Sequence, residues 1–168
     1  LLDPYNITIS NAASSGESGF VANANDSVIN VNTLTTALAS ANLTVSTGSG
    51  GGQAGNITVA APIAWSANSV LTLDASGGIF INANITATGQ NAGLALKHGA
   101  AGYALNGSNI ALSGANSTFR VNDQNYVMIR NVDGLQAMGF SGFYALATDI
   151  DASATAGWNA GRASRRLG

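Results

Sequence analysis

The chain has 168 residues, the length of one ordinary domain, and only 8% of them are charged, against about 25% in typical globular domains. A charged fraction this low, with 46% apolar residues, argues against a disordered tail, and the net charge of −2 excludes a protein that binds phosphates by bulk electrostatics. The absence of cysteine excludes disulfides and thiolate metal sites, and no apolar run approaches the ~20 residues of a membrane span.

Short strands are predicted along most of the chain, because apolar residues alternate with polar or small ones at the period of a half-buried strand. In chain order these strands are 6–9, 28–31, 42–45, 56–59, 70–73, 79–81, 94–96, 110–112, 119–121 and 126–129. One helix is predicted over 33–40, with Leu34 and Leu38 on one face and Asn32 or Thr33 placed to cap it. Because so short a helix is unstable alone, we expect its leucines to cover the N-terminal end or a side face of the core.

The strands recur at a nearly constant spacing, which indicates a repeat architecture. Three pairs of apolar residues define the repeat, at offsets of 22, 22 and 23 residues: Ile57 with Ile79, Ile63 with Ile85, and Leu71 with Leu94. A weaker third copy begins at Ile110, after an insertion at 100–109. We therefore predict that Ile57, Ile79 and Ile110 form one inward column.

Each repeat holds about three short strands and no helix, a pattern typical of one coil of a parallel β-helix. A hairpin array would need recurring Asn-Gly turns, and the only such pair, Asn106-Gly107, does not recur. We predict an all-β fold, a parallel β-helix with rungs of about 22–25 residues. Asparagines at its corners are expected to take left-handed geometry and to stack in ladders, and strand threonines to point outward; these are Asn42, Asn56 and Asn82, and Thr8, Thr44, Thr58 and Thr72.

Two sequence patterns that suggest chemistry have plainer interpretations. The segment 50–55 fits G-x-G-x-x-G, but a dinucleotide site needs a helix after it and a strand is predicted there, so we interpret it as a flexible loop. His98 is the only histidine and so the only candidate for the base of a Ser-His-Asp triad. It lies beside Gly99 at a predicted corner, with no G-x-S-x-G sequence in the chain, so we interpret it as a surface residue.

Asp149 and Asp151 are predicted to lie on one side of a strand, where paired carboxylates can bind Ca²⁺ or serve a glycosidase. The chain has no G-G-x-G-x-D loop and no basic residue between Arg130 and Arg162, so we interpret the pair as part of a turn and expect folding without metal. The aromatic residues are interpreted as packing at the end of the core and not as a sugar-stacking platform: Trp65, Tyr103, Tyr126, Phe140, Phe143, Tyr144 and Trp158. The sequence predicts no catalytic, cofactor-binding or metal-ligating residue.

The opening residues Leu2-Asp3-Pro4-Tyr5-Asn6-Ile7-Thr8-Ile9 resemble the (I/L)DP-x-x-(I/V/L)TI segment of two-partner-secretion exoproteins. These are the filamentous-haemagglutinin-like and high-molecular-weight-adhesin-like proteins of Gram-negative bacteria. The resemblance continues through 29–34, 37–39, 42–45, 55–59, 63–65, 71–75 and 81–89, and residues 144–153 with Trp158-Asn159 are similar to the family's YAL-x-x-DIDAS…WN stretch. It implies a right-handed parallel β-helix shaft, export through an outer-membrane transporter and adhesion, and it supplies no catalytic residues.

From these observations we expect one β-helix segment over 1–161, belonging to a larger protein whose secretion domain lies elsewhere, and a disordered basic tail at 162–168, unlike the family's continuation. The expected function is a structural shaft and binding segment of a secreted bacterial surface adhesin, a virulence factor that attaches to host cells, surfaces or other bacteria. We expect no enzymatic activity, no cofactor, no nucleic acid and no transmembrane segment. Expected partners are the outer-membrane transporter of the parent protein and a receptor or glycan.

Two alternatives remain open. A β-helix enzyme acting on polysaccharides needs acids and bases clustered on one rung face, and the sequence shows no such cluster. A capture module for haem carriers or ice is the other alternative. For ice it needs regular Thr-x-Thr pairs on every rung, and the sequence lacks them.

Overall fold

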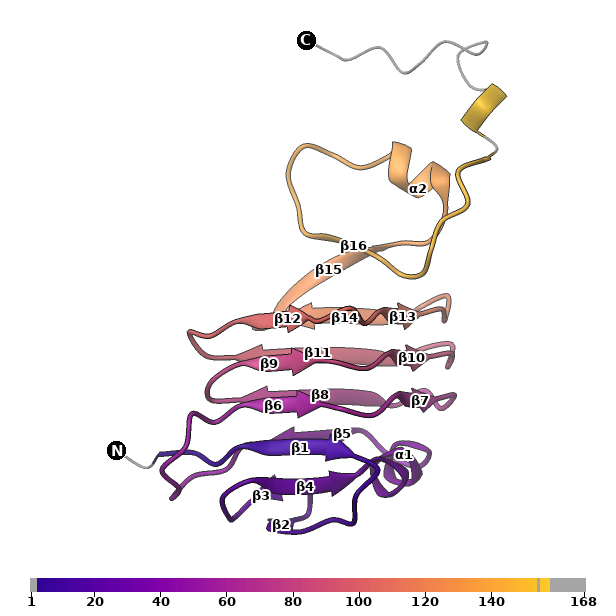
Figure 1. The fold of residues 1–168 in the computed structure, drawn as a ribbon. Coiled ribbons are helices and arrows are strands. Elements are labelled where there is room, and N and C mark those ends of the chain that lie inside the picture. Colours follow the sequence, from indigo (N-terminus) through magenta and orange to yellow (C-terminus); the bar gives the residue numbers. More distant parts are fainter. Residues whose placement is uncertain (1–2, 154, 158–168) are drawn as a thin grey trace.

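The computed structural model describes residues 3–153 and 155–157 and winds them into a right-handed β-solenoid of about five turns with three faces (Figure 1). A five-stranded sheet contains, in spatial order, β12 (Tyr103–Leu105), β9 (Ile79–Ile81), β6 (Ile57–Val59), β1 (Ile7–Ser10) and β4 (Ser27–Asn30). A three-stranded sheet contains β13 (Ile110–Leu112), β10 (Ile85–Ala87) and β7 (Ile63–Trp65). An eight-stranded sheet contains β16 (Tyr144–Leu146), β15 (Gln124–Ile129), β14 (Thr118–Val121), β11 (Gly93–His98), β8 (Val70–Ala75), β5 (Leu43–Ser46), β3 (Val21–Ala22) and β2 (Glu17–Ser18).

The predicted repeat is confirmed by the register of the parallel strands. Three pairings coincide with the predicted offsets: Ile57 with Ile79, Ile63 with Ile85, and Leu71 with Leu94. The predicted third member of the first column was wrong, because Ile79 pairs with Tyr103 and Ile110 instead continues the column of Ile85. Residues 100–109 are therefore not an insertion. They contain β12, the first strand of the third regular rung, which lacks the Ile-x-Ile pattern of β9.

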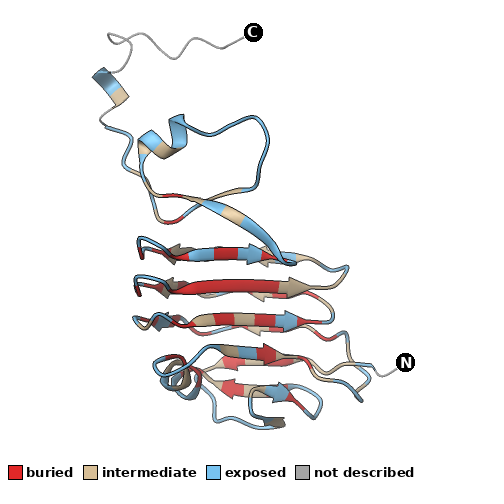
Figure 2. Cartoon of the chain, turned by 180° about the vertical axis from the view of Figure 1, so that it is seen from behind, coloured by how far each residue is buried: buried red, intermediate tan, exposed pale blue. Residues whose placement is uncertain are grey.

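The core consists of inward columns that run along the solenoid axis. In the five-stranded sheet one column joins Ile29, Ile9, Val59, Ile81 and Leu105 through successive pairings. Its first four members are fully buried, whereas Leu105 is 46% exposed. Figure 2 shows the same trend: buried positions alternate along the strands of the stack, and the stretch beyond the last rung is mostly exposed.

The N-terminal end of the stack is covered by α1 (Val31–Leu38), the predicted helix displaced toward the N-terminus by two residues. The helix starts early because the Asn30 side chain accepts hydrogen bonds from the Asn32 and Thr33 amides, so the cap lies outside the predicted pair. Leu34 and Leu38 are fully buried, and α1 contacts β7 and β4. The helix thus packs its two leucines against the core at this end of the stack, as the leucine pattern predicts.

The C-terminal part departs from the regular rungs through a hairpin. Asn122 and Asp123 both have positive φ, 46° and 64°, as in the two-residue turns that match strand twist, and β15 runs antiparallel to β14. A second short helix, α2 (Val132–Gln136), follows and has no buried residue. It was not predicted, since its five residues present no apolar face.

Asparagine side chains connect successive rungs at the corners, as predicted for the ladders. The Asn6 amide oxygen accepts from the Asn56 backbone N–H, and the Asn56 oxygen accepts from the Gly78 N–H (2.9 and 2.8 Å). Asn82 accepts from the Asn106 side chain in the same way. The predicted left-handed geometry was wrong for Asn42, Asn56 and Asn82, because the positive-φ positions outside glycine lie elsewhere among the described residues.

Candidate binding surface

A shallow groove crosses the outward face of the eight-stranded sheet. In register across four strands, one outward row is Thr44, Thr72, Ala95 and Arg120. A neighbouring row is Val70, Gly93 and Thr118. All members of the two rows except Gly93 line a cavity of about 310 Å³. We refer to these seven residues as the sheet groove.

On β11 the two rows contain only Gly93 and Ala95, and both are buried. A Cβ on Gly93 would lie 2.5 Å from Thr118 Oγ1 and 3.1 Å from Val70 Cγ2, so these two side chains already cover Gly93. The cavity lining combines threonine hydroxyls, the Arg120 guanidinium and the Asn42 side chain with the apolar residues Leu43, Val70, Leu94 and Ala95. This lining suits a ligand that is rich in hydroxyls, such as a glycan.

Charged side chains gather at one end of the groove. Asp74 is in register with Lys97, whose Nζ lies 3.3 Å from Asp123 Oδ1, and Arg120 Nη2 lies 4.0 Å from the same oxygen. We call Asp74, Lys97, Arg120 and Asp123 the charged cluster. Its ion pairs are solvent-exposed and therefore contribute little to stability, about 0–1 kcal/mol each, so their main effect is to place charge beside the groove.

The charged cluster corrects the expectation that no rung face brings acids and bases together. The offset that places Leu73 beside Leu96 also places Asp74 beside Lys97, and the next rung adds Arg120 and Asp123. The signal was therefore present in the sequence: the repeat had only to be applied to outward positions as well as to the apolar ones.

The outward threonines form two separate pairs. Thr8 and Thr58 are neighbours on the five-stranded sheet, and Thr44 and Thr72 on the eight-stranded sheet. Both rows then change, to Phe80 in one and to Ala95 in the other. The regular threonine array that ice binding requires does not form on these two faces.

We predicted that His98 is a surface residue at a corner beside Gly99. It is the last residue of β11 and is half-buried. Its Nδ1 lies 2.8 Å from the Gly99 carbonyl oxygen, and its ring lies 5.8 Å from the ring of Tyr103. Its other ring nitrogen is 3.5 Å from the Asn122 amide nitrogen. Among the described residues no serine or carboxylate bonds to the imidazole, so the geometry of a catalytic triad is not formed.

The segment 50–55 is a loop followed by β6, as predicted, without the helix that a dinucleotide site needs. It is not the flexible loop that we expected. The Gly50 and Gly51 amides donate to the Asp3 carbonyl oxygen (2.8 and 2.6 Å), and Tyr5 donates its hydroxyl to the Gly50 carbonyl. The Gln53 side chain accepts from the Asn6 amide.

Asp149 and Asp151 lie in irregular backbone, so the predicted strand was wrong. Their interpretation as part of a turn stays a prediction. Asp151 accepts a hydrogen bond from the Ser153 backbone N–H at 2.8 Å, which lowers the pKa of this exposed carboxyl. Over the residues that the structure describes, no group of three metal-binding side chains occurs.

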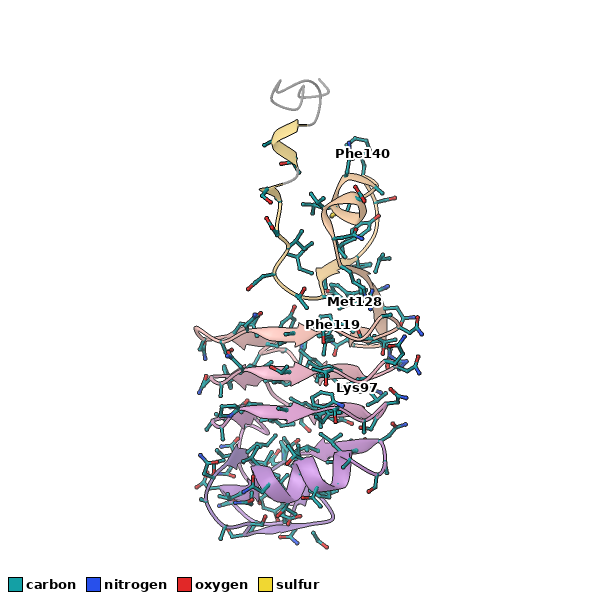
Figure 3. The ribbon with its side chains drawn as sticks, turned by 90° about the vertical axis from the view of Figure 1, so that its right-hand side faces the viewer. Lys97, Phe119, Met128 and Phe140 are labelled. Carbon is teal, nitrogen blue, oxygen red and sulfur yellow. The ribbon has the colours of Figure 1, made fainter. Side chains whose placement is uncertain are left out.

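The predicted aromatic packing holds only in part. Trp65 is buried and donates its indole N–H to the Ser69 carbonyl (3.1 Å), and Tyr126 packs between Phe119 and Phe143 at ring distances of 5.3 and 5.6 Å. Phe140 is fully exposed, which is opposite to a residue that closes the core, and Figure 3 places it far from Lys97 and the regular rungs. Trp158 and the basic stretch 162–166 lie outside the described residues.

Within the described part of the chain, neither helix has the length and hydropathy of a membrane span. Comparisons of the whole chain with known proteins give no match to a family model, to a curated protein or to a solved structure. The resemblance to two-partner-secretion exoproteins therefore stays a prediction.

Proposed function

We propose that this chain is a structural and binding segment of a secreted bacterial surface adhesin, and that it acts without enzymatic chemistry. The observation that carries the proposal is the sheet groove, which spans four strands of the stack and presents threonine hydroxyls and the Arg120 guanidinium among apolar residues. A solenoid holds such a surface in fixed geometry over several rungs, which suits an extended ligand. The resemblance of 2–9 and 144–153 to exported adhesins supports the same function.

The ligand class that we propose is a glycan chain on a host cell or another bacterium. Threonine hydroxyls donate and accept hydrogen bonds, and Arg120 offers planar donors that suit a carboxylate or a ring of hydroxyls. Thr118 and Arg120 are exposed, and Thr72 is half-buried, so these groups face solvent and not the core. In the intact parent, export would depend on an outer-membrane transporter.

A matched pair of variants tests the proposal. Thr72→Glu places a charge and extra volume in the sheet groove, whereas Thr58→Glu makes the same change at an equally half-buried outward position on the five-stranded sheet. On a glycan array and in a cell-attachment assay, we expect Thr72→Glu to weaken binding at least about tenfold, since a lost or clashing polar contact costs about 1–3 kcal/mol. We expect Thr58→Glu to bind like the parent chain. Equal binding by both variants, or no glycan or cell binding by the parent chain, would refute the proposal.

The charged cluster favours a second candidate, an enzyme that acts on polysaccharides. Asp74 and Asp123 are carboxylates beside a groove that fits a glycan, with Lys97 and Arg120 adjacent. Digestion of acidic and neutral polysaccharides, followed by measurement of new reducing ends, separates the candidates. Release of product that Asp74→Asn abolishes, with glycan binding retained, would favour the enzyme.

A further inference from the structure

The C-terminal end of the stack carries an apolar cavity that the proposed function does not use. Its volume is about 210 Å³, several times the ~30 Å³ share of one water molecule. It lies between the last regular rung and β15–β16, and its walls include Tyr103, Leu105, Ile110, Phe119, Met128 and Leu146. Figure 3 shows Phe119 and Met128 at this end of the stack. No charged side chain lines the cavity within the described part of the chain.

The rim of this cavity is an unpaired strand edge. The Gly102 carbonyl accepts from the Ile79 N–H, and the Asn106 N–H donates to the Ile81 carbonyl, so these groups of β12 and its flanks bond toward β9. Backbone groups alternate in direction along a strand, so the N–H and C=O of Tyr103 and Leu105 point to the other side. No partner for these four groups occurs among the described residues, and β12 is the last strand of its sheet.

Two other strands of the last regular rung have partners at this end. β14 is paired with β15, and the Leu112 N–H of β13 donates to the Ala147 carbonyl at 2.7 Å. β12 is the last strand of its sheet, and its inward side chains are partly exposed, Tyr103 at 38% and Leu105 at 46%. The last strand of the eight-stranded sheet is β16, whose Leu146 lies on the opposite wall of the same cavity.

We propose that β12 is a docking edge for an extended strand of another polypeptide that is apolar and uncharged at alternate positions. Strand addition satisfies the free N–H and C=O groups of Tyr103 and Leu105, which a small apolar ligand cannot do. The two inward side chains of the added strand fill the uncharged cavity, as Ile79 and Ile81 fill the rung below. A single strand fits better than a second copy of this chain, because residues 130–153 stand beyond β12 in the path of another stack (Figure 1).

A peptide that copies residues 54–60 is a suitable probe, because β6 already lies in this sheet with Ile57 and Val59 inward. The labelled peptide is titrated with the full chain, and binding is followed by fluorescence anisotropy and by amide exchange. We expect saturable binding with exchange at the Tyr103 and Leu105 amides slowed at least about tenfold. The same peptide with Asp in place of both apolar residues should not bind.

Two matched variants of the chain locate the site. Leu105→Asp puts a charge into the cavity wall and should weaken peptide binding at least about tenfold, since burial of an unpaired charge is costly. Val127→Asp makes a similar change at a comparably exposed apolar residue of β15 outside the cavity lining, and should leave binding unchanged. Both positions are about half exposed, so we expect both variants to keep the melting behaviour of the parent chain.

Equal binding by the Leu105→Asp and Val127→Asp variants would overturn the proposal. So would protection of the Tyr103 and Leu105 amides by self-association of the chain alone, because the occupant would then be a second copy. Peptide binding that appears only after removal of residues 158–168 would also overturn it, since the chain itself would then cover the edge. This inference does not depend on the sheet groove, so its failure would leave the proposed glycan binding untouched.

Discussion

The two ends of the solenoid differ in how completely their last strands and core residues are covered. At the N-terminal end, α1 covers the three-stranded face, the β2–β3 hairpin ends the eight-stranded sheet, and Ser15 bridges to β4 at the edge of the third sheet. At the C-terminal end only the eight-stranded sheet ends in a hairpin, and β12 has an open edge. The two terminal members of one column show the difference: Ile29 on β4 is fully buried beneath the N-terminal cover, whereas Leu105 on β12 is 46% exposed.

Removal of the N-terminal cover should give the largest effect. Leu34→Asp combined with Leu38→Asp removes two fully buried leucines, each worth about 2–5 kcal/mol, and buries charge in their place. We expect α1 to detach while the rungs over 56–96 stay formed, and the exposed end to associate. Light scattering and circular dichroism measure both effects.

The matched control for this double variant is Leu135→Asp on α2, a helix without buried residues, which should have no such effect. A double variant that remains a monomer with unchanged melting would show that α1 covers nothing of consequence.

Paired substitutions in one column test the burial difference directly. Ile81→Ala should lower the free energy of unfolding by about 2–4 kcal/mol, because it leaves a cavity between two rungs. Leu105→Ala should cost less than about 1 kcal/mol, because that side chain is half exposed and has no rung above it. Denaturant titrations of the two variants give the comparison, and similar costs would mean that the open end is covered in solution.

The side chain of Arg130 joins the C-terminal stretch to the last regular rung by hydrogen bonds. The Arg130 guanidinium donates to the Gly114 and Ser117 carbonyls and to Ser117 Oγ, at 3.1, 2.9 and 2.8 Å, and so ties the end of β15 to a corner of the last rung. Arg130→Met removes these bonds and should cost about 1–3 kcal/mol, confined to residues 124–157. Amide exchange that quickens there and stays unchanged in β6 to β11 would agree; a global loss of protection would not.

Removal of the N-cap side chain should destabilise the protein at α1 but not at α2. Asn30→Ala removes the N-cap of α1 and should lower stability by about 1 kcal/mol, because α1 carries part of the core. Asn131→Ala removes the N-cap of α2 and should leave the melting temperature unchanged, because α2 buries nothing. Thermal unfolding of both variants, side by side, makes the test.

The smallest effect is that of pH on the open end. Partial burial, and then the negative charge of nearby Tyr126, raise the pKa of Tyr103 above its ordinary value of 10.0. The folded state therefore holds this proton more tightly than the unfolded state, so stability is unaffected below pH 10 and falls as the pH rises from 10 through the raised pKa. Across that pH range, the free energy of unfolding should fall less steeply for the Tyr103→Phe variant than for the parent chain. An identical pH dependence in the two proteins would contradict the raised pKa of Tyr103.

The regular rungs could be predicted because the local strand pattern, the apolar positions and the repeat spacing all indicate the same structure. The β6 and β9 segments place aliphatic residues at alternate positions and at a fixed offset, and the structure pairs the predicted residues in register. The third rung was misassigned because Tyr103 and Leu105 do not resemble the Ile-x-Ile pattern of the rungs below. The strand there is held by pairing with β9, which no local pattern reveals.

The candidate sites were harder to predict than the fold. His98 and the two C-terminal carboxylates attract attention as isolated residues, yet neither forms a site among the described residues. The sheet groove consists of three threonines, a valine, an arginine, a glycine and an alanine, which become one surface only when four strands align them. A surface of this kind is a property of the register, so it becomes visible only when outward positions are tracked through the repeat.

The position of β1 has a consequence for the order in which the chain can fold. β1 comes first in the sequence but lies second from the edge of its sheet, between β4 and β6. Ile7 pairs with Ser27 on one side and with Ile57 on the other, contacts that close loops of about 20 and 50 residues. A chain that emerges from its N-terminus must therefore extend through Val59 before its first strand has both neighbours, and until then β1 is an edge. We therefore expect the closure of these two loops to be a slow, non-local step of folding, and each later rung to add to one already formed.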